Sequence, residues 1–279
     1  MDDGEKVRPS TIEGIFYPSE KNILVSRLKQ LINHTRAHDR AIGVTHSIIV
    51  PHAAMDYAGQ IAASAYRAAA SRHIETAVLI GPVHREPEEA FFLPQSGVFQ
   101  TPLGSVSVDQ ADMEKLLKRS PLFNADDIPH LEEHCLEAQL PFVQHLFPEA
   151  RIVPILLGKP TRALSNLLTE SLWELYAERI ATTLFVVTAN ITSSVEERLA
   201  REQAARVVEW ITGGDWQSLI EAAEGGSISS CGAGCVAAIL QMNGRLGGRI
   251  TVLEQGSSLP MVKDPKKVVH YAAFVLENR

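Results

Sequence analysis

The chain has 279 residues, of which 45% are hydrophobic and 21% are charged, as is usual for a globular protein with a full core. Its length allows one large α/β domain or two small ones. The formal net charge of −7 argues against a nucleic-acid-binding protein. No apolar run approaches the ~18–20 residues that a membrane span needs.

The start of the chain and its cysteines bear on the cellular compartment. Residues 1–5 are acidic and polar, whereas a secretory signal begins with a basic segment. The chain has three cysteines, Cys135, Cys231 and Cys235. An odd number of cysteines in a large chain is typical of a reducing compartment. We therefore expect a cytoplasmic protein.

Strand-like and helix-like segments alternate along almost the whole chain. Short runs rich in Val, Ile and Leu predict buried strands, and longer amphipathic or alanine-rich segments predict helices. This alternation indicates a single α/β domain over residues 1–279, with a mostly parallel central sheet flanked by helices. In chain order, the sequence predicts a strand at 47–50, a helix at 57–72, a strand at 77–80, a β-hairpin at 90–108, helices at 110–119 and 136–147, a strand at 152–157, a helix at 162–179, a strand at 183–188, helices at 195–212, 216–223 and 234–242, and strands at 249–253 and 268–276.

Two of the predicted strands lead directly into a histidine. The strand at 47–50 runs into Pro51 and His52, and the strand at 77–80 runs through Gly-Pro-Val into His84. Parallel strands end at one edge of their sheet, where α/β proteins place their ligands. The spacing fits one strand-helix-strand unit, which predicts that the two histidines follow neighbouring strands. Because neutral imidazole is a common metal ligand, the pair indicates a metal site. The alternative is that each histidine is only structural.

Two further segments supply candidate residues. Glu133 and His134 precede the helix predicted at 136–147. His134 is a candidate ligand or proton carrier with Glu133 as its partner, although acidic residues also simply favour a helix start. Cys231 lies in a polar loop before a predicted helix, where a thiolate is favoured and can serve as a third ligand. The alternative for a free cysteine is a small buried apolar residue.

A series of short motifs runs in order from about residue 8 to about residue 274. These motifs are Arg8-Pro9, Gly14-Ile15-Phe16-Tyr17-Pro18, Pro51-His52-Ala53, Tyr57-Ala58-Gly59, Gly81-Pro82-Val83-His84, Thr101-Pro102-Leu103-Gly104, Val108-Asp109, Glu133-His134-Cys135-Leu136-Glu137, Leu140-Pro141-Phe142 and Cys231-Gly232. Each motif alone is weak evidence, but their order and spacing together are specific. The series resembles the Memo family (mediator of ErbB2-driven motility; AmmeMemoRadiSam system protein B in prokaryotes).

The resemblance implies a fold similar to the class III extradiol, or LigB-type, dioxygenases, which hold non-haem iron(II) at a sheet edge. It implies a metal pocket formed by His52, His84 and Cys231, with iron(II) or copper as the metal. Two imidazoles and one anionic ligand leave coordination positions open. AMMECR-type and radical SAM proteins are the implied partners. The other residues expected in the pocket are His134, as the catalytic residue, and Tyr57, Glu133, Asn190 and Ser193.

The chain departs from the family pattern after the strand predicted at 183–188. The family motif Ser-Ser-Asp-Phe-x-His corresponds here to residues 188–193, so that Asn190 replaces an aspartate and Ser193 replaces a histidine. In the dioxygenase relatives a histidine in this region is the acid/base, a role that serine does not fill unaided. The chain is therefore identified as a divergent member of the family.

Three functions are consistent with these residues. The first is a Memo-like cytoplasmic metal-binding protein with iron- or copper-dependent redox or oxygen chemistry. The second is a binding or partner protein of an AmmeMemoRadiSam-type system whose pocket has lost catalysis. The third is a metal-dependent hydrolase, which would need an acidic ligand at the strand ends. The sequence places no such ligand beside His52 or His84.

Overall fold

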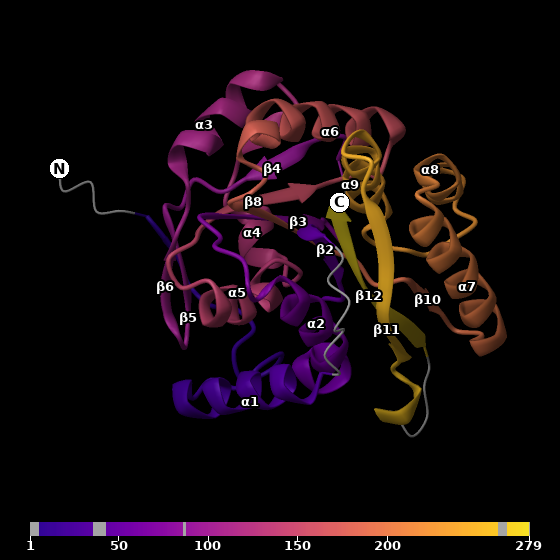
Figure 1. The fold of residues 1–279 in the computed structure, drawn as a ribbon, viewed down its shortest axis with the longest axis horizontal. Helices are drawn as coiled ribbons and strands as arrows, with labels where there is room; N and C mark the ends of the chain where they lie inside the picture. Colours follow the sequence, from indigo (N-terminus) through magenta and orange to yellow (C-terminus); the bar gives the residue numbers. More distant parts are fainter. Residues whose placement is uncertain (1–5, 36–42, 86–87, 262–266, 279) are drawn as a thin grey trace.

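The computed structural model describes residues 6–35, 43–85, 88–261 and 267–278. The acidic segment 1–5, which contributed to the expectation of a cytoplasmic protein, lies outside the described residues. Within them the chain forms an α/β fold with a large central sheet and helices on both of its faces (Figure 1). This arrangement confirms the predicted fold class, whereas the likeness to LigB-type dioxygenases stays a prediction.

Four parallel strands form the centre of the large sheet. Nearly all of their residues are buried, because helices cover both faces, and such strands are therefore continuous apolar runs in the sequence. All four agree with predicted strands. Their order across the sheet is β2 (Val44–Val50), β9 (Thr183–Thr188), β3 (Thr76–Pro82) and β8 (Arg151–Leu157).

The outer strands make the sheet mixed. The long strand β12 is antiparallel to β2, β10 and β11, and β4 is antiparallel to β8 but parallel to β7. The two late strands agree with the prediction, whereas β7 and β10 are too short to leave a periodic pattern. The bounds of these strands are β4 (Phe91–Leu93), β7 (Phe123–Ala125), β10 (Thr192–Ser194), β11 (Arg249–Ser257) and β12 (Val268–Asn278).

The order of the central strands corrects one prediction. The strands that lead to His52 and His84 are not neighbours, because β9 lies between β2 and β3 and pairs in parallel with both. The crossover rule fixes the hand of a strand-helix-strand connection, and it leaves room for a later strand to insert between the two. The carboxyl end of β9 therefore lies between the two histidines.

The helices lie in layers on the two faces of the sheet. Helix α2 packs on β2, β11 and β12, with α1 and α5 beside it, while α9 packs on β3 and β9, with α6 and α8 beside it (Figure 1). Helix α7 lies against β10, β11 and β12. No helix among the described residues is long and apolar enough to cross a membrane. The helices are α1 (Lys21–His34), α2 (Met55–Ala69), α3 (Gln110–Arg119), α4 (Ile128–Glu132), α5 (Leu140–Leu146), α6 (Arg162–Tyr176), α7 (Glu197–Gly213), α8 (Trp216–Glu224) and α9 (Ala233–Arg245).

Two predicted segments are divided in the structure. The helix expected at 136–147 is a short 3₁₀ turn, Glu137–Gln139, followed by α5, with Pro141 in the first turn of that helix. A proline there loses no helical hydrogen bond. The hairpin expected at 90–108 separates into β4, which joins the large sheet, and a hairpin of β5 (Val98–Thr101) and β6 (Gly104–Ser107). Strand β1 (Val7–Arg8) pairs with β5 to complete a second, three-stranded sheet.

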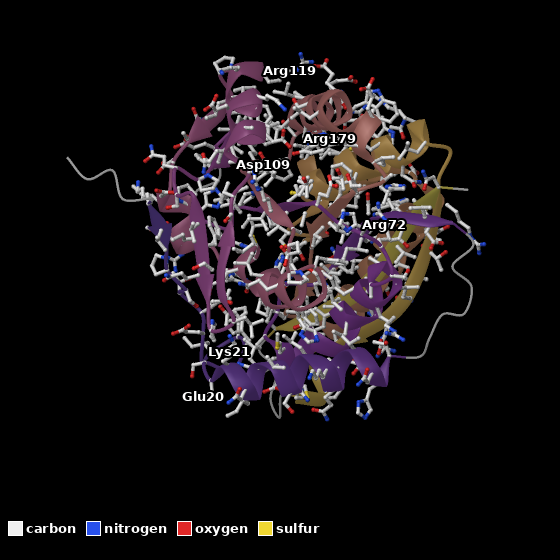
Figure 2. The ribbon with its side chains drawn as sticks, turned by 60° about the vertical axis from the view of Figure 1, so that its left-hand side comes forward. Glu20, Lys21, Arg72, Asp109, Arg119 and Arg179 are labelled. Atoms are coloured by element: carbon white, nitrogen blue, oxygen red, sulfur yellow. The ribbon has the colours of Figure 1, made fainter. Side chains whose placement is uncertain are left out.

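The Arg72 side chain ties β2 and β9 together where these strands begin (Figure 2). Its guanidinium donates to the carbonyl oxygens of Thr45 in β2 and Thr183 in β9, and also to those of Ile180 and Ala181 just before β9. A guanidinium offers five donors in a fixed plane, so one side chain can satisfy several carbonyls that strand pairing leaves open. The contact holds the two strands together at the edge opposite the histidines.

A buried carboxylate holds the segment that precedes α1. Glu137 is fully buried, and its Oε2 lies 2.6 Å from Nη1 of Arg8, which is also buried. The carboxylate also accepts from Tyr17 Oη at 2.6 Å and from the backbone amides of Thr11 and Ile12. Burial acts to raise the pKa of Glu137, but the Arg8 charge and these donors lower it. The charged form therefore stabilises the fold.

We expect the Glu137→Gln substitution to destabilise the protein by about 3–5 kcal/mol, because it leaves the buried Arg8 charge without its partner. Urea unfolding monitored by circular dichroism measures the change. Glu114→Gln is the matched control. It breaks a pair with Lys118 in which both side chains are exposed, and such pairs contribute at most about 1 kcal/mol. Equal losses in the two variants would contradict the role given to Glu137.

Candidate metal centre

Three of the predicted ligands converge at the carboxyl edge of the sheet. His52 follows β2, His84 follows β3, and Cys231 lies just before α9. Their possible ligand atoms all lie within 4.8 Å of one another. His52 Nε2 is 3.2 Å from Cys231 Sγ, and the ring centroids of the two histidines are 5.1 Å apart. The structure therefore brings together the two imidazoles and the thiol that the sequence singles out.

The orientations of the three imidazole rings bear on which nitrogens can reach a common ion. An imidazole binds a metal through a lone pair in its own ring plane. The His52 and His84 rings are inclined by 85°, so their planes intersect and both can point to one ion. The His134 ring instead stacks on His84, with centroids 5.1 Å apart and planes inclined by 18°. The side chains of His84, Glu133 and His134 form a second group whose possible ligand atoms also lie within 4.8 Å of one another, so His134 is a further candidate ligand beside the first three.

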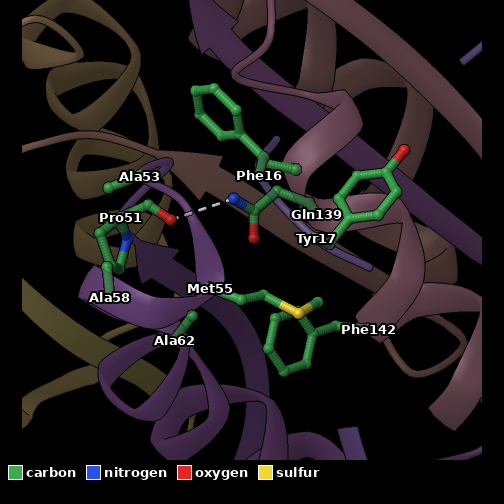
Figure 3. Close-up of a pocket in the computed structure, with 11 residues that line it drawn as sticks. Phe16, Tyr17, Pro51, Ala53, Met55, Ala58, Ala62, Gln139 and Phe142 are labelled. Atoms are coloured by element: carbon green, nitrogen blue, oxygen red, sulfur yellow. Dashed lines mark hydrogen bonds between the residues drawn. The ribbon is translucent and has the colours of Figure 1, made fainter. Parts of the chain in front are cut away.

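His52 is held from two sides. The residue is fully buried, and its Nδ1 lies 2.5 Å from Thr188 Oγ1 at the end of β9. Its backbone N–H donates to Asn190 Oδ1 at 3.4 Å. Behind it, Gln139 Nε2 donates to the carbonyl oxygen of Pro51 at 3.0 Å, across a small hollow lined by Met55 and other apolar side chains (Figure 3). These contacts fix the position of the imidazole.

His84 is bound to Glu133, which corrects the partner expected for that carboxylate. The sequence predicts Glu133 as the partner of His134. In the structure Glu133 Oε2 lies 2.7 Å from His84 Nδ1, and Oε1 accepts the His84 backbone N–H at 2.5 Å. Glu133 caps the C-terminus of α4 and is 4% exposed, whereas the His84 side chain is 31% exposed. The cluster thus has a buried side at His52 and an open side at His84.

Cys231 reaches the cluster because the chain passes very close to β9. The backbone N–H of Asn190 donates to Cys231 Sγ at 3.3 Å. A Cβ atom at the next residue, Gly232, would lie 2.5 Å from both the Cβ of Ala189 and the carbonyl oxygen of Thr188. Contacts this short are not tolerated, so a glycine is required there. Asn190 therefore contributes its backbone and its side chain to the site.

The charges of the site favour a thiolate beside an imidazolium. Burial acts to raise the pKa of the Cys231 thiol, but the adjacent His52 and His84 rings outweigh it and lower the pKa to about 5. Burial acts to lower the pKa of His84, whereas Cys231 and Glu133 raise it to about 10. Burial and the two neighbouring imidazoles lower the pKa of His134 to about 4. At neutral pH His134 is uncharged and can accept a proton.

Two predicted pocket residues lie apart from these contacts. Tyr57 is in the first turn of α2 and is 41% exposed, and among the described residues no hydrogen bond or ring contact joins it to the cluster. Ser193 lies in β10, where its backbone N–H donates to Ser229 Oγ at 3.1 Å. Its own Oγ is buried without a hydrogen-bond partner among the described residues. Ser193 is therefore not in the hydrogen-bond network of the cluster.

Sequence reasoning missed two residues that shape the site. Thr188 contacts His52, and Phe16 packs its ring 4.9 Å from that of His134. Phe16 stands in a motif that carries the family resemblance, and Thr188 stands in the segment 188–193 where the chain departs from it, but neither pattern shows which side chains are in contact. The contact of Phe16 depends on the folding of the N-terminal segment onto Glu137.

Comparison with known proteins matches the sequence of this chain to one family. The sequence pattern described as Memo-like protein matches residues 8–275. The chain is 28% identical over 271 residues to a MEMO1 family protein of Thermoplasma volcanium, covering 96% of this chain and 98% of that one. It is 31% identical over 278 residues to a MEMO1 family protein of Ignicoccus hospitalis, covering 96% and 97%. A MEMO1 family protein of Thermotoga maritima is 28% identical over 278 residues, covering 96% and 99%.

Gly232→Ala should destabilise the protein by about 1–3 kcal/mol, because the added methyl group forces the chain away from β9. Chemical unfolding of the purified variant measures this loss. Gly244→Ala is the control; Gly244 lies in the last turn of α9, the helix that Gly232 precedes. A Cβ atom at Gly244 meets nothing within 4 Å, so alanine should raise stability by up to about 1 kcal/mol. A Gly232→Ala variant as stable as the parent would refute the close approach.

The lowered pKa of Cys231 predicts its reactivity. Iodoacetamide reacts with thiolates, so at pH 7 one thiol per chain should react fast, while the buried Cys135 and Cys235, whose pKa values are raised, react slowly. As the pH falls the thiolate is protonated, and the fast rate should decline with a midpoint near pH 5. Mass spectrometry of the alkylated peptide identifies the site. A midpoint near 8.5, the ordinary value, or a fast phase that survives Cys231→Ser, would count against the assignment.

Proposed function

The chain belongs to the Memo family, and from this membership we propose that it is a metal-binding protein that holds iron(II) or copper through His52, His84 and Cys231. The observation that carries the proposal is the convergence of these three donors within 4.8 Å. Two imidazoles and a thiolate suit both iron and copper. The inclined rings of the two histidines and the lowered pKa of the thiol support the same use.

The residues around the three donors support redox or oxygen chemistry. A bound iron or copper ion would supply a Lewis acid and a site of electron transfer. The chain itself would bind a small reactant from the open side at His84, where the side chain is 31% exposed. Neutral His134, stacked on His84, would accept or return a proton at the same place. Phe16, packed on His134, would exclude water from one side of that ring.

A second function is favoured by one specific observation. Asn190 and Ser193 stand where the resemblance implies an aspartate and a histidine, and Ser193 Oγ has no hydrogen-bond partner among the described residues. Neither side chain is an acid/base at neutral pH. A non-catalytic protein that binds the metal and docks an AMMECR-type or radical SAM partner would not need that pair. Both functions use the same metal site, and they differ in whether the protein catalyses a reaction there.

The proposed location is the cytoplasm. Cys135, Cys231 and Cys235 are all free thiols. Thiols persist in reducing compartments, where disulfides are rare. The proposed use of Cys231 as a ligand also requires the reduced thiolate.

The metal proposal predicts stoichiometric binding that depends on three side chains. Protein purified without oxygen and loaded with Fe(II) or Cu(I) should retain about one ion per chain, measured by mass spectrometry of the metals. His52→Ala, His84→Ala and Cys231→Ser should each lose most of that ion. The controls are His73→Ala, which alters an exposed histidine, and Cys235→Ala, which alters a buried cysteine of α9. Both controls should bind as the parent does.

Oxygen uptake by the loaded protein then separates the two functions. Consumption above background with catechols or with a reductant, lost in His134→Ala, supports the redox function. Full metal binding with background uptake supports the partner protein instead. The ligand assignment is wrong if the parent retains no metal, or if the three variants retain as much as the parent.

A further inference from the structure

Each proposed ligand histidine is engaged through its other ring nitrogen by a different kind of partner. His52 Nδ1 lies 2.5 Å from the hydroxyl oxygen of Thr188, and His84 Nδ1 lies 2.7 Å from the carboxylate of Glu133. In both rings Nε2 remains for the ligand. Thr188 is fully buried and Glu133 is 4% exposed, so water does not replace either contact.

We propose that Thr188 is the positioning residue of the metal centre, and that it turns His52 Nε2 toward Cys231 and the ion. This inference rests on the proposed metal function. The register of the sheet supports this inference, because Thr188 pairs directly with Val50, two residues before His52. The backbone N–H of Ala189 also donates to the Val50 carbonyl at 2.9 Å. The insertion of β9 between the two histidine-bearing strands thus places a hydroxyl beside His52.

The chemistry of a hydroxyl differs from that of a carboxylate at this position. A carboxylate only accepts, so Glu133 requires a proton on His84 Nδ1. A hydroxyl both donates and accepts, so Thr188 can stay bonded to His52 Nδ1 whether that nitrogen carries a proton or a lone pair. His52 can therefore donate from Nε2 to the Cys231 thiolate without an ion, and present a lone pair from Nε2 to an ion. In neither state is the buried Nδ1 left without a partner.

The two histidines thus have separate tasks. His52 is buried and has an uncharged partner, so that it serves as the fixed ligand. His84 is partly exposed and has an anionic partner, which raises the basicity of its ring. Replacing the Thr188 hydroxyl by a methyl group would leave His52 Nδ1 buried and unpaired, which favours other ring orientations.

The test compares Thr188→Val, which keeps the branched shape without the hydroxyl, with Thr188→Ser, which keeps the hydroxyl. Cu(I) affinity is measured by competition with a coloured chelator. We expect Thr188→Val to bind Cu(I) about 10–100-fold more weakly, the usual effect of losing such a partner, and Thr188→Ser to stay within about 3-fold of the parent. Thr183→Val is the matched control. Thr183 is buried at the start of β9, and its hydroxyl donates to the Arg179 carbonyl, away from the cluster.

Nitrogen NMR of the histidine rings in the metal-free protein gives a second measurement that does not depend on metal binding. Thr188→Val should shift the His52 Nδ1 resonance, Thr188→Ser should restore it, and Thr183→Val should leave it unchanged. An unshifted His52 resonance, or unchanged Cu(I) affinity in Thr188→Val, would overturn the role of Thr188. If the parent binds no metal, the proposed function fails, and the NMR measurement still decides whether Thr188 orients His52.

Discussion

The buried carboxylate of Glu137 determines how the N-terminal segment meets the rest of the protein. Its oxygens accept from Arg8, Tyr17 and the backbone between them, so residues 8–17 are wrapped around one charge. The carbonyl oxygen of Phe16 then accepts from the backbone N–H of Met55, the first residue of α2, at 2.8 Å. The Phe16 ring packs on His134. A single charge with its donors thus sets the start of a helix and one wall of the site.

The two histidines of the candidate centre differ in burial and in their hydrogen-bond partners. One histidine is buried beside a hydroxyl, and the other is partly exposed beside a carboxylate. The Cys231 thiol lies beside the histidines because the next residue, Gly232, packs closely against the end of β9. The third imidazole, His134, stacks on His84 and is uncharged at neutral pH. The His52 side of the centre is enclosed by the interior, and the His84 side is open to solvent.

The sequence predicts the large elements and the identity of the clustered residues, because apolar periodicity and strand ends are local properties. The four central strands, the helix at 110–119 and the placing of His52 and His84 at one sheet edge follow from these patterns, whereas the resemblance to the Memo family adds Cys231 to them. The insertion of β9 between β2 and β3 does not, because strand order is set by pairing between distant segments. The pairing of Glu133 with His84 instead of His134 could not be predicted for the same reason. Adjacent residues on a turn face different directions, and only the folded chain shows which imidazole the carboxylate meets.

The long strand β12 has a consequence for how the site is assembled. Strand β12 comprises residues 268–278. It pairs with β2, which leads to His52, although the two strands are far apart in the sequence. Glu277 of β12 also accepts from the Thr45 hydroxyl of β2. Contacts between segments so distant along the chain slow folding, since a long loop must close before they form. Strand β2, which leads to His52, is therefore among the last strands to gain both of its neighbours, β9 and β12. His52 and Cys231 are separated by 179 positions along the chain, so during synthesis the two imidazoles and the thiol come together only after the segment that ends at Cys231 has been made.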